Sequence, residues 1–373
     1  MKGSITIGKI KGIQLEINLS WFVVFALVVF TLATGYFPQN YPAWDQGLTW
    51  ILSGVIALLL FISVLLHELA HSLVSVSLGI NVKKISLFIF GGIAEIEKEP
   101  DVPAKELKIA VAGPATSILL FILFTILANT TVFLGGSEAL TVLLAYVGNV
   151  NLVLAIFNLV PAFPLDGGRV LRAIIWYLTG NLHKATKIAS SLGSIFSYIL
   201  IFIGIFGVLS GTFISGIWFI FIGWFINQAS QSSYQNMVLS DIFKKIPVRE
   251  FMTDKVMTVD YHVSVQDLVD NYFFKYRFAC FPVLRNEEVI GLVDRDRVKK
   301  INRELWDRTT VGSIIDPLND DLIVSPEECV SDAMKKLFSN ETGRVLVIDQ
   351  ANLRGIVSRT DILNYIRIHT QFN

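Results

Sequence analysis

Cysteine, histidine and net charge are all scarce in this 373-residue sequence. It has 2 cysteines and 5 histidines, and its 31 basic residues balance 31 acidic ones, so the formal net charge is zero. The two thiols, Cys280 and Cys329, make no disulfide framework, and we expect both to be reduced in the cytosol. A chain without a basic excess gives no indication of a nucleic-acid partner.

Charged side chains of either sign are also sparse, at 17% of the residues against 53% hydrophobic ones. The mean hydropathy of +0.58 is too high for an ordinary soluble domain and indicates several membrane spans. The apolar runs lie within residues 1–230, whereas residues 241–373 carry dense charge and no run long enough to span. We therefore expect a membrane domain over residues 1–230, a flexible polar linker over 231–245 and a soluble domain beyond it.

Six apolar runs approach the roughly 20 residues that a membrane helix needs, although the last two are short. The first run has no small-residue cleavage site at its polar end, so we expect a retained span rather than a signal peptide. The six expected spans are Leu19–Tyr36, Leu48–Leu78, Ile109–Leu134, Ala139–Val160, Ile195–Ser210 and Ile214–Ile226.

Lysine and arginine are distributed unevenly around these runs. They occur before the first run, after the second and after the fourth, whereas the loops 36–48, 134–139 and 210–214 have none. Because cytosolic loops carry the positive excess, we expect a multi-pass protein of the cell membrane with both termini and the soluble domain in the cytosol. The second and fourth runs then both end at the cytosolic face.

The second run contains His67-Glu68-Leu69-Ala70-His71 near that face. On a helix, residues i and i+4 share one side, so both imidazoles can bind a single Zn²⁺. Glu68 is placed to take a proton from a water molecule that the metal activates. Ionisable side chains inside an apolar run are costly and usually functional, which favours a metal site over a structural role.

A catalytic zinc keeps three protein ligands and one open position, so the histidine pair needs a third ligand. We assign Asp166, which follows the fourth run in Pro161-Ala162-Phe163-Pro164-Leu165-Asp166-Gly167-Gly168. The prolines interrupt a helix and the glycines permit a sharp turn, and irregular backbone at membrane depth is tolerated where it lines a cavity. The alternative is a juxtamembrane turn in which Asp166 caps a helix.

Three segments together resemble the site-2 protease family of intramembrane zinc metalloproteases. They are His67-Glu68-x-x-His71, then Gly113-Pro114-Ala115-Thr116-Ser117, and then Asn158-x-x-Pro161 with Leu165-Asp166-Gly167. The resemblance covers roughly residues 1–230 and implies one zinc ion held by His67, His71 and Asp166, with Glu68 as general base. It also implies that Asn158 holds the substrate backbone or the developing oxyanion. Ser117 departs from the family, in which Asn is commoner, but it still offers a hydroxyl.

The same resemblance implies regulated intramembrane proteolysis. The substrate would be a single-span membrane protein, such as a membrane-tethered transcription factor or anti-sigma factor, cut near the cytosolic face. Residues 82–96 are rich in β-formers around Gly91-Gly92 and predict two short strands beside the site. An exposed sheet edge holds a peptide extended by strand addition, although a plain surface hairpin has the same pattern. Residues 169–191 alternate apolar and basic side chains and predict an interfacial helix.

Residues 241–373 contain an internal repeat of strand, helix, strand, strand and helix. The segments Val289–Arg297 and Leu353–Asp361 occupy equivalent places in the two copies. The repeat resembles a tandem pair of CBS domains, over residues 246–303 and 304–373, and this implies binding of ATP, ADP or AMP and a possible route to a homodimer. The fold class is therefore a polytopic α-helical membrane protein with about six spans and a short membrane-associated β-hairpin, joined to a soluble α/β tandem CBS pair.

In CBS domains a Gly-apolar-apolar-Ser/Thr-x-x-Asp motif supplies a hydroxyl near the phosphates and an Asp for the ribose. The second copy has this motif, with Ser358 and Asp361, whereas Asp294 and Arg297 stand at those places in the first copy. An acidic group there would repel phosphate, so we expect at most one nucleotide site per chain. A structural or dimerising pair is the alternative.

The leading interpretation is an intramembrane zinc protease modulated by nucleotide. One alternative is a non-catalytic, zinc-binding membrane protein that senses nucleotide, and another is a CBS module with a membrane anchor. Glu68 favours the protease because zinc binding alone has no use for a carboxylate beside the first ligand. An anchor has no need for buried ionisable residues.

Overall fold

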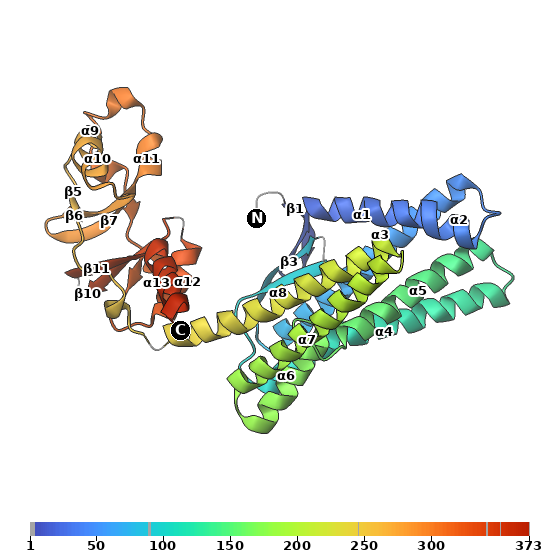
Figure 1. The fold of residues 1–373 in the computed structure, drawn as a ribbon. Helices are drawn as coiled ribbons and strands as arrows, with labels where there is room; N and C mark the ends of the chain where they lie inside the picture. Colours follow the sequence, from blue (N-terminus) through green and yellow to red (C-terminus); the bar gives the residue numbers. More distant parts are fainter. Residues whose placement is uncertain (1–3, 89–90, 245, 341, 351, 373) are drawn as a thin grey trace. The chain divides into compact units, whose positions relative to one another are not determined.

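The computed structural model describes residues 4–88, 91–244, 246–340, 342–350 and 352–372. The chain forms two compact units, Met1–Gln235 and Asn236–Asn373 (Figure 1). Each unit has its own hydrophobic core.

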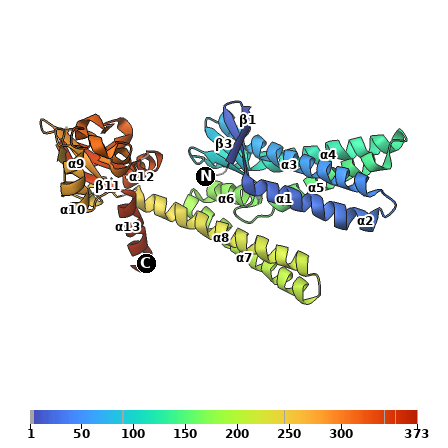
Figure 2. The same cartoon turned by 90° about the horizontal axis from the view of Figure 1, so that it is seen from above.

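Six helices among the described residues are long and apolar enough to cross a membrane, as expected from the sequence. The first, Leu19–Asn40, combines α1 (Leu19–Thr31), a π-turn over Leu32–Tyr36 and α2 (Phe37–Asn40). The others are α3 (Gln46–Ser77), α4 (Pro103–Phe133), α5 (Glu138–Asn158), α7 (Leu182–Leu209) and the Phe213–Gln235 part of α8 (Phe213–Phe243). In both views α4 and α5 run side by side (Figures 1 and 2).

Polar residues cap the starts of several of these helices. The side chain of Asn18 accepts a hydrogen bond from Ser20 N at 3.0 Å, and that of Asp45 accepts one from Gly47 N at 2.7 Å. Such caps satisfy backbone donors that have no partner inside the helix. α3 therefore begins at Gln46 and continues without a break through both histidines of the expected metal site.

A four-stranded sheet lies at one end of the helices of the first unit (Figure 2). Its order is β1 (Ser4–Ile10), β2 (Ile13–Asn18), β3 (Val82–Phe88) and β4 (Gly91–Ile96), with β2 and β3 parallel and the other pairs antiparallel. The two strands expected over residues 82–96 are confirmed. They belong to a four-stranded sheet, whereas the sequence predicted a hairpin of two strands. Lys11 and Gly12, with φ of 47° and 87°, form the tight turn that adds β1 and β2.

The prediction of a single helix over residues 169–191 is wrong, because two helices share these residues. α6 (Asp166–Thr179) ends where Gly180 adopts φ 64°, and Asn181 caps the next helix by accepting from Lys184 N at 2.9 Å. A glycine in the left-handed region ends the first helix, and an Asn cap starts the second. Residues 182–191 therefore belong to α7, which is much longer than the expected span.

The second unit contains two similar α/β halves, as the repeat predicts. The first has β5 (Val259–Asp260), a helical segment from Val265 to Tyr276, β6 (Cys280–Arg285), β7 (Glu288–Asp294) and α11 (Arg295–Lys299). The second has β9 (Ile323–Val324), α12 (Val330–Ser339), β10 (Arg344–Asp349), β11 (Asn352–Ser358) and α13 (Arg359–Phe372).

The two halves interlock at their N-terminal segments. Phe243 and Val248 precede the first half but pack in the core of the second, while Val311 and Ile314 pack in the core of the first. The short strand β8 (Asp316–Pro317) likewise pairs with β7. The pair therefore folds as one body rather than as two consecutive modules.

The expected flexible linker over residues 231–245 is helical as far as Phe243. Residues 224–246 contain neither glycine nor proline, so nothing in the local sequence stops the helix that crosses the membrane. Polarity alone was the basis for expecting a loop, and a polar segment without glycine or proline can stay helical.

Candidate active site

α3 carries His67, Glu68 and His71 in a buried part of the first unit. The two histidines are one turn apart and are only 3% and 6% exposed. Their rings lie with centroids 4.9 Å apart and nearly perpendicular planes. The i, i+4 spacing therefore brings both imidazoles to one side of the helix, as the sequence predicts.

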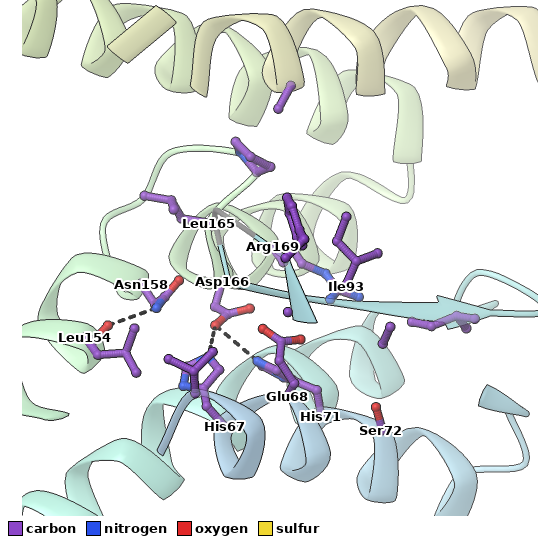
Figure 3. Close-up of a pocket in the computed structure, with 18 of the residues that line it drawn as sticks. His67, Glu68, His71, Ser72, Ile93, Leu154, Asn158, Leu165, Asp166 and Arg169 are labelled. Atoms are coloured by element: carbon purple, nitrogen blue, oxygen red, sulfur yellow. Dashed lines mark hydrogen bonds and ion pairs between the residues drawn. The ribbon is translucent and has the colours of Figure 1, made fainter. Parts of the chain in front are cut away.

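Asp166 is the first residue of α6 and lies against both imidazoles (Figure 3). Its Oδ2 is 3.1 Å from Nε2 of His67 and 3.2 Å from Nε2 of His71. Two atoms bound to a tetrahedral zinc at about 2.0–2.1 Å are roughly 3.3 Å apart, so these separations fit a shared ion. Burial raises the pKa of Asp166, but the two imidazoles outweigh that effect and hold the pKa at about 2. The carboxylate is therefore ionised, as a metal ligand must be.

The other ring nitrogen of each histidine is also engaged. Nδ1 of His71 lies 2.6 Å from the carbonyl oxygen of Ile109, and Nδ1 of His67 lies 2.8 Å from Oγ of Ser117. A carbonyl only accepts, so Nδ1 of His71 donates and its Nε2 keeps a lone pair for a metal. Contacts of this kind fix the tautomer and the orientation of metal-binding histidines.

Both of these supports come from one row of α4. Ile109, Gly113 and Ser117 are spaced by four residues and face the histidines. A Cβ at Gly113 would lie 2.1 Å from Nε2 of His71 and 2.5 Å from Nε2 of His67. Only glycine leaves room there for the two nitrogens that would hold the ion. The sequence contained Gly113 and Ser117 within a motif but gave no means of assigning these contacts.

A cavity of about 450 Å³ opens beside these side chains. Glu68 lines it together with the three candidate metal ligands, and β4 forms part of its wall. A Cβ at Gly92 would lie 2.3 Å from Cγ of Glu68, so β4 passes directly over that carboxylate. The sequence gave no role to Arg169 or Ser72, which also line the cavity. Figure 3 shows both around the metal-binding side chains.

Asn158 lines the same cavity at the C-terminal end of α5. Its Nδ2 donates to the carbonyl oxygen of Leu154 at 2.9 Å (Figure 3). An amide nitrogen carries two hydrogens, so a second donor and the Oδ1 acceptor have no partner among the described residues. Among the described residues β4 pairs with β3 alone, so no strand pairs with its other edge.

The residues expected at the nucleotide site lie at the start of α13. Oδ2 of Asp361 accepts hydrogen bonds from Ser358 N at 2.8 Å and Ser358 Oγ at 2.7 Å. In the first half, Asp294 accepts from the backbone N of Arg297 at 2.9 Å, and the Arg297 guanidinium pairs with Asp316 at 2.7 Å. The motif side chains therefore lie at equivalent helix starts in both halves.

Comparisons with known proteins match both parts of the chain. Residues 55–140 and 136–201 match the model of peptidase family M50, and residues 248–303 and 311–368 match that of the CBS domain. Over 369 residues the chain is 31% identical to a zinc metalloprotease of Methanocaldococcus jannaschii, with 99% of this chain and 97% of that protein covered. The chain belongs to peptidase family M50, the site-2 proteases. It is also 32% identical over 370 residues, 98% of this chain and 96% of the relative, to a Synechocystis sp. protein named provisionally as a zinc metalloprotease.

A solved site-2 protease from Methanocaldococcus jannaschii is 34% identical to this M50 peptidase, with a TM-score of 0.44. The match covers 61% of this chain and 94% of the solved chain. The two family models, the Methanocaldococcus jannaschii zinc metalloprotease and the six apolar helices show that the chain is a multi-pass zinc metalloendopeptidase with a tandem CBS pair. Both expected resemblances are confirmed.

Proposed function

We propose that this M50 peptidase hydrolyses a peptide bond within or next to the membrane-spanning segment of a single-span protein, near the cytosolic face. The observation that carries the proposal is the placement of Glu68 beside His67, His71 and Asp166 in one cavity, next to an open sheet edge. The proposed product is a protein part freed from the membrane, such as a transcription factor or a fragment of an anti-sigma factor.

His67, His71 and Asp166 would hold a zinc ion, whose Lewis acidity would polarise the scissile carbonyl and lower the pKa of a water molecule. The Glu68 carboxylate takes a proton from the attacking water as its oxygen adds to the carbonyl carbon. Glu68 then gives that proton to the leaving nitrogen as the C–N bond breaks, which leaves one new carboxyl end and one new amino end.

Substrate binding is assigned to β4 and Asn158. In a helix the backbone N–H and C=O groups bond to each other and the side chains cover the peptide bonds. A membrane-spanning substrate must therefore be extended before it is cut. The free edge of β4 offers backbone hydrogen bonds to such an extended segment, next to the general base. The uncommitted amide hydrogen of Asn158 is available to the substrate backbone or to the oxygen that becomes negative in the transition state.

The topology that we propose puts both termini, the CBS pair and the metal-binding residues toward the cytosol. The support is the positive charge of the segments before the first, after the second and after the fourth spans. Water then reaches the site from the cytosol.

We also propose that an adenine nucleotide bound through Ser358 and Asp361 alters the cleavage rate. The proposal requires two arrangements of the chain that cleave at different rates. A nucleotide shifts the equilibrium between them only if it binds one arrangement better than the other. Cleavage by the full chain and by a truncation after Gln235, each with and without ATP, tests the idea. An ATP effect that is lost on truncation supports it, and a full-length rate that ignores ATP contradicts it. Whether the pair also forms a homodimer stays a prediction.

Affinity capture tests the proposed substrate class. The full chain with Glu68→Gln, expressed in cells without the wild type, should hold uncleaved single-span proteins, which zinc-loaded wild type then cuts at one site. The control is Glu99→Gln, an exposed carboxylate in the loop after β4. If both variants hold the same proteins, or if the wild type cuts none of them, the proposed substrate class is wrong.

A further inference from the structure

A buried ion pair attaches α6, the helix that starts with Asp166, to α4. Glu106 and Arg172 are only 1% and 7% exposed. Arg172 Nε donates to Glu106 Oε1 at 2.6 Å, and a terminal nitrogen of the guanidinium contacts the same oxygen. Two donors on one carboxylate oxygen make a directional, charge-assisted contact.

Glu106 continues the row of α4 that supports the two histidines. It precedes Ile109 by three residues, and Gly113 and Ser117 follow on the same side of the helix. Glu106, Ile109, Gly113 and Ser117 are all buried. One face of α4 therefore contacts both imidazoles and, through Glu106, the helix that carries the third proposed ligand.

Arg172 also contacts the segment that leads into Asp166. Its guanidinium carbon lies 5.0 Å from the centre of the Phe163 ring, in a cation–π arrangement. Phe163 comes three residues before Asp166, and Arg172 comes six residues after it. The side chain of Arg172, which follows the bend that presents Asp166, thus contacts Phe163 before the bend and Glu106 on α4.

The first turn of α6 packs closely on the segment that precedes it. A Cβ at Gly167 would lie 2.2 Å from Leu159 O, and one at Gly168 would lie 2.3 Å from Phe163 N. Leu165 provides no side-chain hydrogen bond to the helix, whereas Phe163 N donates to Ala189 O of α7 at 3.3 Å. Contacts that position the segment before α6 therefore also position its first turn. An ion pair taken out of water is costly and adds little net stability over apolar packing, so its value here lies in the geometry that it imposes.

We propose that Glu106 and Arg172 form a positioning pair that holds Asp166 at the distance from His67 and His71 that zinc requires. Neither residue touches the ion or the substrate. The inference rests on the proposed zinc site, which has its own test: Asp166→Ala should lose zinc. If that variant keeps zinc, the site is wrong whatever the pair does.

The test compares zinc affinity with stability in the purified full-length chain. The variants are Glu106→Gln, Arg172→Met and the double variant Glu106→Gln/Arg172→Met, which leaves no unpaired buried charge. We expect each to bind zinc at least about tenfold more weakly in competition with a zinc-chelating dye, as for other residues that orient metal ligands. The double variant should unfold, without zinc, close to the temperature of the wild type.

The control is Asp101→Asn, which breaks an exposed pair with Lys105, 2.9 Å away, near the start of the same helix. It should bind zinc as the wild type does. A double variant that is folded and binds zinc with wild-type affinity would show that the pair only stabilises the fold, and would overturn the proposal. If the single variants do not fold, the double variant still decides the question.

Discussion

Oγ of Ser117 lies 2.8 Å from Nδ1 of His67, between two membrane helices and fully out of contact with solvent. The contact gives a role to Ser117, the position at which the sequence analysis expects Asn to be commoner. A hydroxyl and an amide can both engage an imidazole nitrogen, so either residue type could make this contact.

Ser117→Ala should therefore weaken zinc binding by about tenfold or more, because His67 loses the partner that orients its ring. The measurement is zinc competition with a chelator on the purified full chain. Ser53→Ala is the matched control, since Ser53 is equally buried but its hydroxyl donates to Thr49 O at 2.6 Å on its own helix. Equal zinc affinities in the two variants would show that Ser117 does not orient His67.

Gly113→Ala should abolish stoichiometric zinc binding. The new methyl carbon would lie 2.1 Å from Nε2 of His71, where it displaces the nitrogen that faces the ion. We expect a loss of affinity on the order of a hundredfold or more. The control is Gly54→Ala on α3, where a Cβ meets no neighbour within 4 Å. Elemental analysis of the purified variants measures their zinc content. A Gly113→Ala variant with a full complement of zinc would contradict the close contact of Gly113 with the two histidines.

The sequence predicted the parts of the site that depend on spacing along one helix or on a recognisable motif. His67, Glu68 and His71 follow from helical periodicity, and Asp166 follows from the broken segment after the fourth span. The contacts of Ile109 and Glu106 could not be predicted in this way. They depend on how α4 packs against α3 and α6, and neither residue type is distinctive in a sequence.

Two features that the sequence analysis did not predict have a signal in the sequence. Residues 13–18 alternate apolar and polar side chains strictly, and Gly12 directly before them favours a tight turn. Gly180-Asn181 similarly combines a helix-ending residue with a helix-starting one. The helix through residues 231–243 had no such signal, because polar segments of this composition form loops and helices alike.

Cys280 should resist alkylation in the folded chain. Burial raises its pKa to about 11, because it disfavours the charged thiolate. The folded state therefore keeps the thiol proton at pH 8, and the stability that this contributes is lost only as the pH rises from about 9 towards 11. In a Cys329→Ser variant, iodoacetamide at pH 8 should label the chain in guanidinium but not under native conditions. Rapid native labelling would contradict the buried placement.

Asp361→Ala should weaken ATP, ADP or AMP binding far more than Arg297→Ala does. In the second half the Ser358 hydroxyl and the Asp361 carboxylate lie together at the start of α13, whereas in the first half Arg297 is committed to Asp316. Lost hydrogen bonds to a charged group correspond to roughly tenfold or more in affinity. Calorimetry on the full chain measures this, with thermal unfolding as the check that loss of the Asp361 cap leaves the fold intact. Equal effects would place the nucleotide elsewhere.

The central claim is that Glu68 is the general base of a zinc peptidase, and Glu68→Gln tests it most directly. The amide has the size of the carboxylate but cannot take the proton from water, so cleavage should fall by about 10²–10⁴-fold. His67, His71 and Asp166 are unchanged, so zinc should remain at one ion per chain. The measurement is zinc content and cleavage of a fluorescence-quenched apolar peptide by the same purified sample. Full zinc with cleavage lost is the predicted result, and full zinc with wild-type cleavage would contradict the account.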